Sequence, residues 1–150
     1  MSSFKRHKNS HGREIALQGL YQIEIGNSPV AEVLHFRWLN EAMDKEERAF
    51  CEELICGVID HGPALDEILA ASSTVDFSQI SSIVRCIIKM GIYEIRKSGR
   101  EPSIVLDDLL NLARRYEGDQ AVPFINGILD RYVRDMQEAA VKRLAQGSDA

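Results

Sequence analysis

The sequence predicts an all-α protein of six or seven helices, and three observations support this fold class. Apolar residues recur at intervals of three and four along most of the 150-residue chain. No segment shows the strict apolar–polar alternation of a half-buried strand. Connections are short and marked by Gly or Pro, and no linker divides the chain. With 45% hydrophobic and 27% charged residues, we expect one globular domain over residues 1–150.

A basic arm, residues 1–9, leads into a first helix expected over residues 10–25. The first 13 residues hold four fixed positive charges and no acid: Lys5, Arg6, Lys8 and Arg13. Because the net charge of the whole chain is −5, the other 137 residues carry −9. Like charges this close repel each other unless an anion shares the space. The arm is therefore either a solvated tail or a cationic segment that binds phosphates.

Capping residues delimit the next helices. Gly26-Asn27 suits a left-handed end of the first helix, and Ser28-Pro29 suits the start of a second. Asp44, with Glu47 three residues later, predicts the start of a third helix. A proline at position 63 removes a backbone donor, so we expect a kink or break after His61.

Residues 78–97 show the strongest helical periodicity, with isoleucines spaced by three and four. Apolar residues cover most of the circumference, so we expect this helix to be central and contacted on several sides. Its narrow polar stripe is Arg85, Lys89 and Arg96, which is either a solvated edge or a surface that faces a ligand. We take Arg85 and Lys89 as candidates for partner binding.

Two more helices are expected after the turn at residues 98–102. Asp107 and Asp108 lie near the start of the first, where acids favour the helix dipole, so we do not interpret them as a catalytic pair. Gly118 ends that helix, and Pro123 lies in the opening turn of the last one. The polar segment 146–150 is expected to fray.

No constellation of residues typical of an enzyme is found. There is no phosphate-cradling Gly-rich loop, nucleophile elbow or H-E-x-x-H motif, so we expect no catalytic activity and no cofactor. Three cysteines on apolar stripes suggest reduced thiols, and a metal site is not expected. Without a signal peptide or a membrane span, the cytoplasm is the expected location.

Several segments, in order along the chain, resemble the NusB family of bacterial transcription antitermination factors. They are REIALQGLYQ (13–22), CEELICGVI (51–59), IIKMGIYEI (87–95), LNLARRY (110–116) and FINGILD (124–130). The resemblance implies two small helical bundles. It also implies binding to NusE, a small-subunit ribosomal protein, and to the boxA segment of nascent ribosomal RNA transcripts within an antitermination complex on RNA polymerase. Some members of the family form homodimers.

The resemblance also implies site residues. The basic arm of the family matches Lys5 and Arg13, with Arg6 and Lys8 nearby, whereas its contiguous arginines fall on Asn9, Ser10 and His11. An aspartate of the family falls on Gln120, or on Asp119 with a slip of one residue. The aromatic RNA contact falls on Phe124, and Asn126 either bonds RNA or braces the turn. The tyrosine associated with NusE is Tyr21.

The sequence therefore predicts an RNA-binding antitermination factor. The candidates for RNA binding are Lys5, Arg6, Lys8, His11, Arg13, Gln120, Phe124 and Asn126. Those for partner binding are Tyr21, Arg85 and Lys89. The alternative is a helical protein–protein adaptor or homodimer with little RNA binding of its own.

Overall fold

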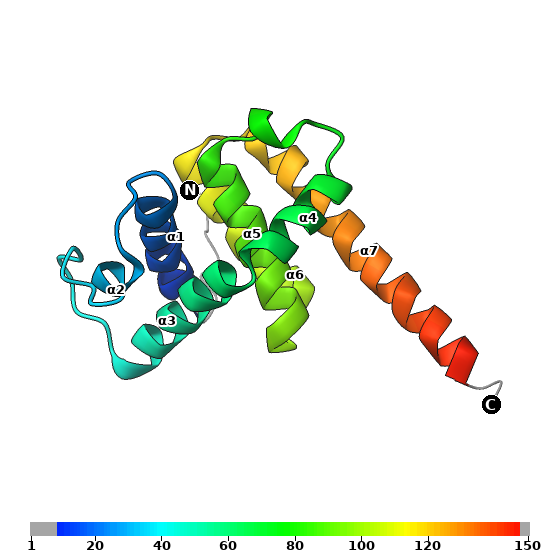
Figure 1. Ribbon diagram of the computed structural model, residues 1–150, viewed down its shortest axis with the longest axis horizontal. Helices are drawn as coiled ribbons and strands as arrows, with labels where there is room; N and C mark the ends of the chain where they lie inside the picture. Colours follow the sequence, from blue (N-terminus) through cyan, green and yellow to red (C-terminus); the bar gives the residue numbers. More distant parts are fainter. Residues whose placement is uncertain (1–8, 148–150) are drawn as a thin grey trace, which may run out of the picture.

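The computed structural model describes residues 9–147, and these residues form seven α-helices, one short 3₁₀ helix and no strand (Figure 1). The all-α prediction is confirmed. The α-helices are α1 (Ser10–Glu24), α2 (Val30–Val33), α3 (Lys45–Asp60), α4 (Gly62–Ser72), α5 (Ser82–Ser98), α6 (Pro102–Tyr116) and α7 (Ala121–Gly147). The 3₁₀ helix η1 spans Phe77–Gln79.

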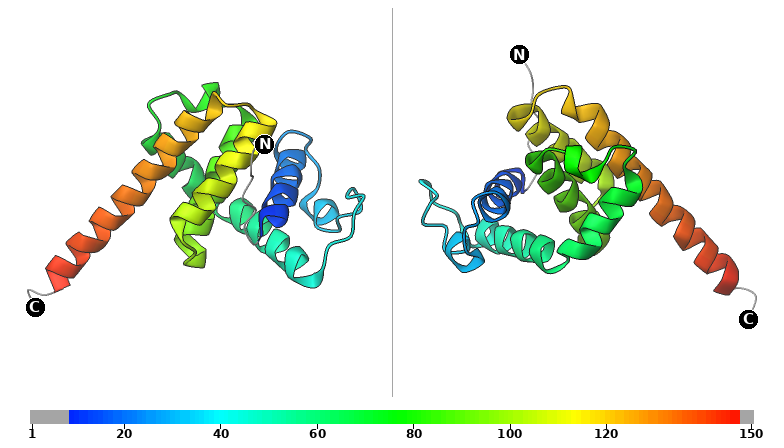
Figure 2. Two further views of the ribbon diagram at one scale, coloured as in Figure 1. Left: turned by 180° about the vertical axis from the view of Figure 1, so that it is seen from behind. Right: turned by 45° about the horizontal axis from the view of Figure 1, so that its top comes forward.

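The helices form two groups that share α5. In the first, α1 packs against α3 and α2; in the second, α4, α6 and α7 pack around α5 (Figures 1 and 2). Because α5 also contacts α1 and α3, it joins the two groups. The predicted central position of this helix is confirmed.

The start of α5 differs from the prediction. The helix begins at Ser82, four residues after the expected position 78. Residues Phe77–Gln79 form η1 instead, and the Ser81 hydroxyl then caps α5 by accepting a hydrogen bond from the backbone N–H of Val84 at 3.2 Å. The apolar spacing continues across this cap, which explains why periodicity alone placed the boundary too early.

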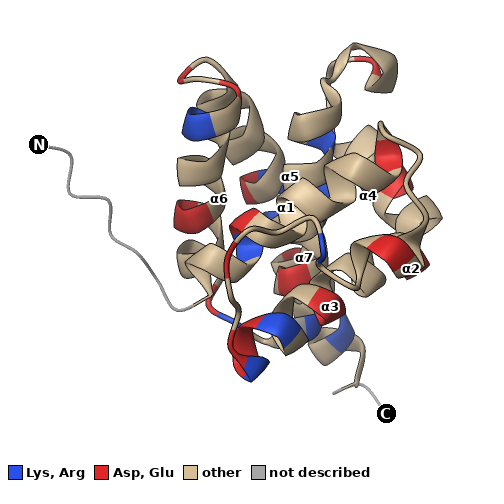
Figure 3. Cartoon of the chain, turned by 90° about the vertical axis from the view of Figure 1, so that its left-hand side faces the viewer, with Lys and Arg blue, Asp and Glu red and all other residues tan. Residues whose placement is uncertain are grey.

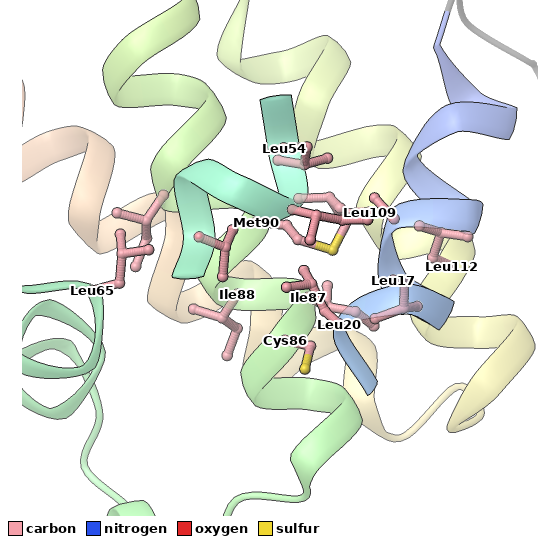
Figure 4. Close-up of a cluster of buried hydrophobic side chains, with 14 of the residues drawn as sticks. Leu17, Leu20, Leu54, Leu65, Cys86, Ile87, Ile88, Met90, Leu109 and Leu112 are labelled. Atoms are coloured by element: carbon pink, nitrogen blue, oxygen red, sulfur yellow. The ribbon is translucent and has the colours of Figure 1, made fainter. Parts of the chain in front are cut away.

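The core lies where α5 meets α1, α3, α4 and α6 (Figure 4). Ile87, Ile88 and Met90 of α5 are fully buried there. Leu17 and Leu20 reach them from α1, and side chains of the other helices close the cluster (Figure 4). Burying large aliphatic side chains contributes roughly 1.5–3 kcal/mol each, so this cluster stabilises the packing of α5 against its neighbours.

Glycines allow the closest helix contacts. A Cβ atom on Gly57 of α3 would lie 2.1 Å from Cζ of Tyr93 on α5, and one on Gly12 of α1 would lie 2.7 Å from Cδ1 of Phe50 on α3. Both distances are far below van der Waals contact. The start of α1 is therefore pressed directly against α3.

Local sequence rules set most helix ends. The Asp44 carboxylate accepts a hydrogen bond from the backbone N–H of Glu47 at 2.8 Å, which confirms the predicted cap of α3. The predicted break after His61 is also confirmed, because α3 ends at Asp60 and α4 begins at Gly62. Asn27 has φ 53° and Gly99 has φ 66°, so both chain reversals use left-handed backbone.

The last helix is the longest, and its C-terminal part extends away from the other helices (Figures 1 and 2). Met136 is the last residue of α7 that packs against the core. From Gln137 onward every described side chain is exposed. The helix continues to Gly147, two residues into the segment expected to fray.

Candidate nucleic-acid interface

The root of the basic arm, where residue 9 meets α1, is tied to α6. Asn9 adopts φ 76°, a left-handed conformation that asparagine tolerates. Its carbonyl accepts the first helical bond, from Arg13 N–H at 2.9 Å. The Ser10 hydroxyl donates to Oδ1 of Asp108 on α6 at 2.7 Å. Lys5, Arg6 and Lys8, the predicted phosphate ligands, lie outside the described residues.

Arg13 points into the protein, where its side chain is only 1% exposed. Its Nε donates to Glu94 of α5 at 2.8 Å, and its Nη1 donates to Asp108 at 2.7 Å. A second bond, from Nη2 to Glu94, completes a two-pronged contact. Burial lowers the pKa of Arg13, but these partners outweigh it and the pKa is raised. The prediction that Arg13 holds a phosphate is therefore wrong, because its donors are already engaged by buried carboxylates.

The ion pair with Arg13 also changes the interpretation of Asp108, which we expected to favour the dipole of its helix. Helix α6 begins at Pro102, so Asp108 is in the second turn and is 4% exposed. It balances the charge of Arg13 and does not act through the helix dipole. Arg100 also donates to Glu94 at 3.0 Å, and the guanidinium groups of Arg13 and Arg100 lie 5.5 and 4.9 Å from the centre of the Phe50 ring.

His11 lies between two carboxylates. Its Nε2 is 2.8 Å from Glu41 in the loop before α3, and its Nδ1 is 3.4 Å from Glu47 in the first turn of α3. Burial lowers the pKa of His11, but the hydrogen bonds and charges of these two acids outweigh it and raise the pKa above its ordinary value. The structure thus places this RNA-binding candidate against acidic side chains.

The turn between α6 and α7 is held by α1. The Tyr116 hydroxyl accepts a hydrogen bond from Gln18 at 2.8 Å and donates one to Glu14 at 3.2 Å. Gly118 has φ 105°, which lets the chain reverse. Gln120, predicted to meet RNA, is exposed, and its amide donates to the Glu117 carbonyl at 2.6 Å.

Phe124 and Asn126 lie in the first turns of α7. Phe124 packs against the core and is half-buried, so the residue is still partly accessible to solvent. The Asn126 side chain is exposed and makes no hydrogen bond within residues 9–147. No hydrogen bond within residues 9–147 therefore supports a role for Asn126 in bracing the turn.

The partner-binding candidates are divided. Tyr21 is 39% exposed on α1 and is available to a partner. Arg85 lies 4.8 Å from the centre of the Phe77 ring and donates to the Phe77 carbonyl at 3.3 Å. Lys89 is 7% exposed and forms ion pairs with Glu24 at 3.4 Å and Asp66 at 3.3 Å. The ammonium group is thus already engaged by two carboxylates of the same chain, and its contact with a partner stays a prediction.

Two exposed arginines were missed as candidates. Arg114 and Arg115 lie in the last turn of α6, close to the turn that leads to Phe124, and Arg115 forms an ion pair with Glu14. The two adjacent cations in LNLARRY (110–116) are the sequence signal that marks them. Blue and red segments are interspersed over α1, α3 and α6 in Figure 3. Along the sequence, the basic arm remains the main concentration of positive charge.

Residues 9–147 hold neither a cluster of metal-ligating side chains nor a helix suited to a bilayer. Within residues 9–147, no three His, Cys, Asp or Glu side chains gather as a metal site would need. No helix in that range has the length and hydropathy needed to span a bilayer. Cys51, Cys56 and Cys86 are free thiols, and burial raises the pKa of Cys51 to about 12, with Glu47 and Glu52 adding to the effect.

Known proteins resemble this chain over most of its length. Residues 10–134 match the NusB family. A transcription antitermination protein NusB of Sorangium cellulosum is 33% identical over 129 residues, which cover 85% of this chain and 92% of the relative. That of Geobacillus kaustophilus is 31% identical and covers 89% and 99%.

Solved structures show the same fold. NusB of T. maritima superposes with a TM-score of 0.74 at 22% identity and covers 85% of this chain and 91% of its own. A chain from the complex of antitermination factors NusB and NusE with double-stranded RNA gives 0.75 at 20% identity, with 84% and 96% covered. The matched residues run from the start of α1 well into α7 and include every described candidate residue. The chain therefore belongs to the NusB family.

Proposed function

We propose that this protein is a transcription antitermination factor that binds RNA together with NusE. The observation that carries the proposal is the family match over residues 10–134. The expected RNA is a boxA segment of a nascent ribosomal transcript, and the expected assembly is the antitermination complex on RNA polymerase in the cytoplasm. The protein acts by binding and has no catalytic role.

In the proposed mode of binding, two surfaces hold the RNA. Lys5, Arg6 and Lys8 supply phosphate contacts, and the exposed part of Phe124 supplies an apolar surface for a base. Helix α6 lies between these two surfaces. Its residue Asp108 accepts a hydrogen bond from Ser10 at the root of the arm, and its last residue, Tyr116, precedes the turn that leads to Phe124. Tyr116 follows Asp108 by eight positions, which corresponds to a rise of about 12 Å along the helix.

Fluorescence anisotropy with boxA RNA tests the proposal. The chain should bind boxA RNA more tightly than a scrambled RNA of equal length, and NusE should increase the difference. Because Arg13 is buried, three phosphate contacts remain in the arm. At about −0.7 per contact on single-stranded RNA, the slope of log K against log salt should be near −2. Equal affinity for the two RNAs, with and without NusE, would refute specific recognition.

A triple substitution separates this function from an adaptor that binds only protein. Lys5→Ala, Arg6→Ala and Lys8→Ala together should weaken RNA binding and bring the salt slope close to zero. Binding of NusE alone should stay unchanged, which provides the control for folding. If boxA binding in the presence of NusE survives all three changes, the adaptor or homodimer alternative is the better description.

A further inference from the structure

The end of α7 lies beyond the segment that matches the family. The match to the NusB family stops at residue 134, whereas the helix continues to Gly147. Met136 is the last side chain of α7 that packs against the core, and the helix then extends away from the other helices (Figures 1 and 2). We call residues 137–147 the tail. It presents a surface that the matched part of the fold does not include.

Two large apolar side chains of the tail are exposed. Val141 is 65% exposed and Leu144 is 75% exposed, whereas the other large apolar side chains that reach solvent within residues 9–147 are at most 44% exposed. Because Val141 and Leu144 are three residues apart, they lie on one face of the helix, which they share with Gln137 and Ala140.

This apolar face does not continue the side of α7 that contacts the core. Leu129, Tyr132 and Met136 mark the core side, at spacings of three and four. At 3.6 residues per turn, Val141 and Leu144 are turned from Met136 by about 140° and 80° around the helix axis. The described part of the chain does not cover them, so a second molecule is needed to bury this face.

Opposite charges stand beside the apolar face. In the part of the chain that the structure describes, Glu138 and Lys142 form no ion pair, although other acidic and basic side chains of α7 do. The two residues are four positions apart, so they lie on the same side of the helix. Together with neighbouring side chains they border an open groove of about 390 Å³, lined by Arg134, Gln137, Glu138, Val141 and Lys142.

We propose that the tails of two copies of this chain pair side by side in antiparallel orientation, about a two-fold axis near Ala140. The axis places Lys142 of the second copy opposite Glu138, and Glu138 of the second copy opposite Lys142. A two-fold interface requires this kind of reciprocal contact, because both copies present the same surface. The tail is therefore complementary in charge to a reversed copy of itself.

The same axis brings the apolar side chains together. The two Val141 side chains meet near the axis, and each Leu144 packs over the aliphatic part of Gln137 of the second copy. Ala140, at the crossing point, is small enough to let the two helices approach closely. A parallel pair would instead place Glu138 beside Glu138 and Lys142 beside Lys142, which is unfavourable.

Antiparallel pairing also keeps the two folded bodies apart. With the axis at residue 140, residue 147 of one copy lies opposite residue 133 of the other, so the helices overlap along about 21 Å. Each body lies at its own end of this overlap, whereas a parallel pair would bring both bodies to the same end. Neither α1 nor Phe124 takes part in the contact. The inference therefore goes beyond the proposed function and does not depend on it.

Sedimentation equilibrium of the full chain without RNA tests the pairing. The contact is smaller than the roughly 1,200 Å² of a standard interface, so we expect a weak dimer with a Kd of about 0.1–1 mM. Val141→Ala/Leu144→Ala should weaken it at least about tenfold. Alanine favours helix, so unwinding of the tail would not explain that loss.

A matched control uses exposed apolar side chains elsewhere. Val75 is 38% exposed and Ile104 is 41% exposed, and both lie outside the tail. Val75→Ala/Ile104→Ala should dimerise like the wild type. If the wild type stays monomeric at about 1 mM, or if the tail variant dimerises as well as this control, the pairing is refuted.

Reversed charges test the orientation and the identity of the partner. Glu138→Lys and Lys142→Glu each place like charges opposite each other in an antiparallel pair, so each variant alone should dimerise at least about threefold more weakly. An equal mixture of the two variants restores opposite charges at both positions and should associate as tightly as the wild type. A parallel pair predicts a different result, with single variants like the wild type and a mixture that is tighter, and this result would overturn the antiparallel arrangement.

RNA is the other possible occupant of the tail, and anisotropy separates it from a second copy. At protein concentrations far below the dimer Kd, Val141→Ala/Leu144→Ala and Lys142→Glu should bind boxA RNA as the wild type does. A loss of RNA affinity in these variants would assign the tail to RNA and overturn the inference. Failure of the wild type to prefer boxA RNA over a scrambled RNA would refute the proposed function and leave the pairing of the tails unaffected.

Discussion

Two neighbouring residues of α1 form ion pairs with the same helix, α6, in opposite surroundings. Arg13 pairs with Asp108, and the two side chains are 1% and 6% exposed. Glu14 pairs with Arg115, and these side chains are 18% and 52% exposed. The chemistry is similar and the sequence positions are adjacent. The inner pair is shielded from water and Arg13 has a second carboxylate partner in Glu94, whereas the outer pair is partly exposed, so the two pairs should differ strongly in what they contribute to stability.

The largest effect is expected from Arg13→Ala. Its removal leaves Glu94 and Asp108 as buried carboxylates without their main partner, which should lower the free energy of unfolding by about 3–5 kcal/mol. Urea denaturation monitored by circular dichroism measures the change. A loss below about 1 kcal/mol would mean that the cluster relaxes or takes up water, and the contrast with the outer pair would disappear.

A smaller loss is expected from Asp108→Asn. The amide can still accept a hydrogen bond from Arg13, and Glu94 still neutralises the guanidinium group, so about 1–3 kcal/mol should be lost. The same denaturation series gives the value. A loss as large as that of Arg13→Ala would show that Asp108, and not the contact with Glu94, supplies most of the stabilisation.

The smallest effect is expected at the outer pair. Arg115→Ala should cost at most about 1 kcal/mol, because solvent already screens the charge and both side chains lose freedom in pairing. A double-mutant cycle with Glu14→Gln should give a coupling of about 0.2–1 kcal/mol that vanishes near 1 M salt, where the screening length is about 3 Å. A coupling that persists in high salt would make the outer pair resemble the buried one.

The sequence was sufficient for the helices because their signals are local. The Asp44 cap, the break after His61 and the periodicity of α5 each depend on residues a few positions apart. Helix number and order followed from these local features. The start of α5 was missed because the apolar spacing runs through the Ser81 cap.

The site was harder to predict, because charge alone does not tell which way a side chain points. Arg13 precedes Ala16 and Leu17 by three and four residues, so it lies on the buried stripe of α1. Asp108 precedes the buried Leu112 by four residues, so it lies on the buried stripe of α6. When an arginine lies on the apolar stripe of one helix and a carboxylate on that of another, the pattern predicts a buried ion pair between them. We instead grouped Arg13 with the basic arm because of its position in the chain.

The arm itself could be identified only by composition and resemblance. Lys5, Arg6 and Lys8 fall outside the described residues, so their contact with phosphate remains a prediction. Phe124 is half-buried as expected for the first turn of α7, and its contact with a base is likewise a prediction.

The length of α7 has a consequence for how its end folds. An isolated helix shorter than about 12–15 residues is marginal in water, because starting the first turn is costly. The segment from Phe124 to Met136 packs on the core and supplies that start, so the eleven residues to Gly147 only need to extend an existing helix. The free end should therefore unwind and rewind within about a microsecond while the packed part stays intact. Amide exchange should accordingly quicken steadily from Met136 towards Gly147, and not in one step.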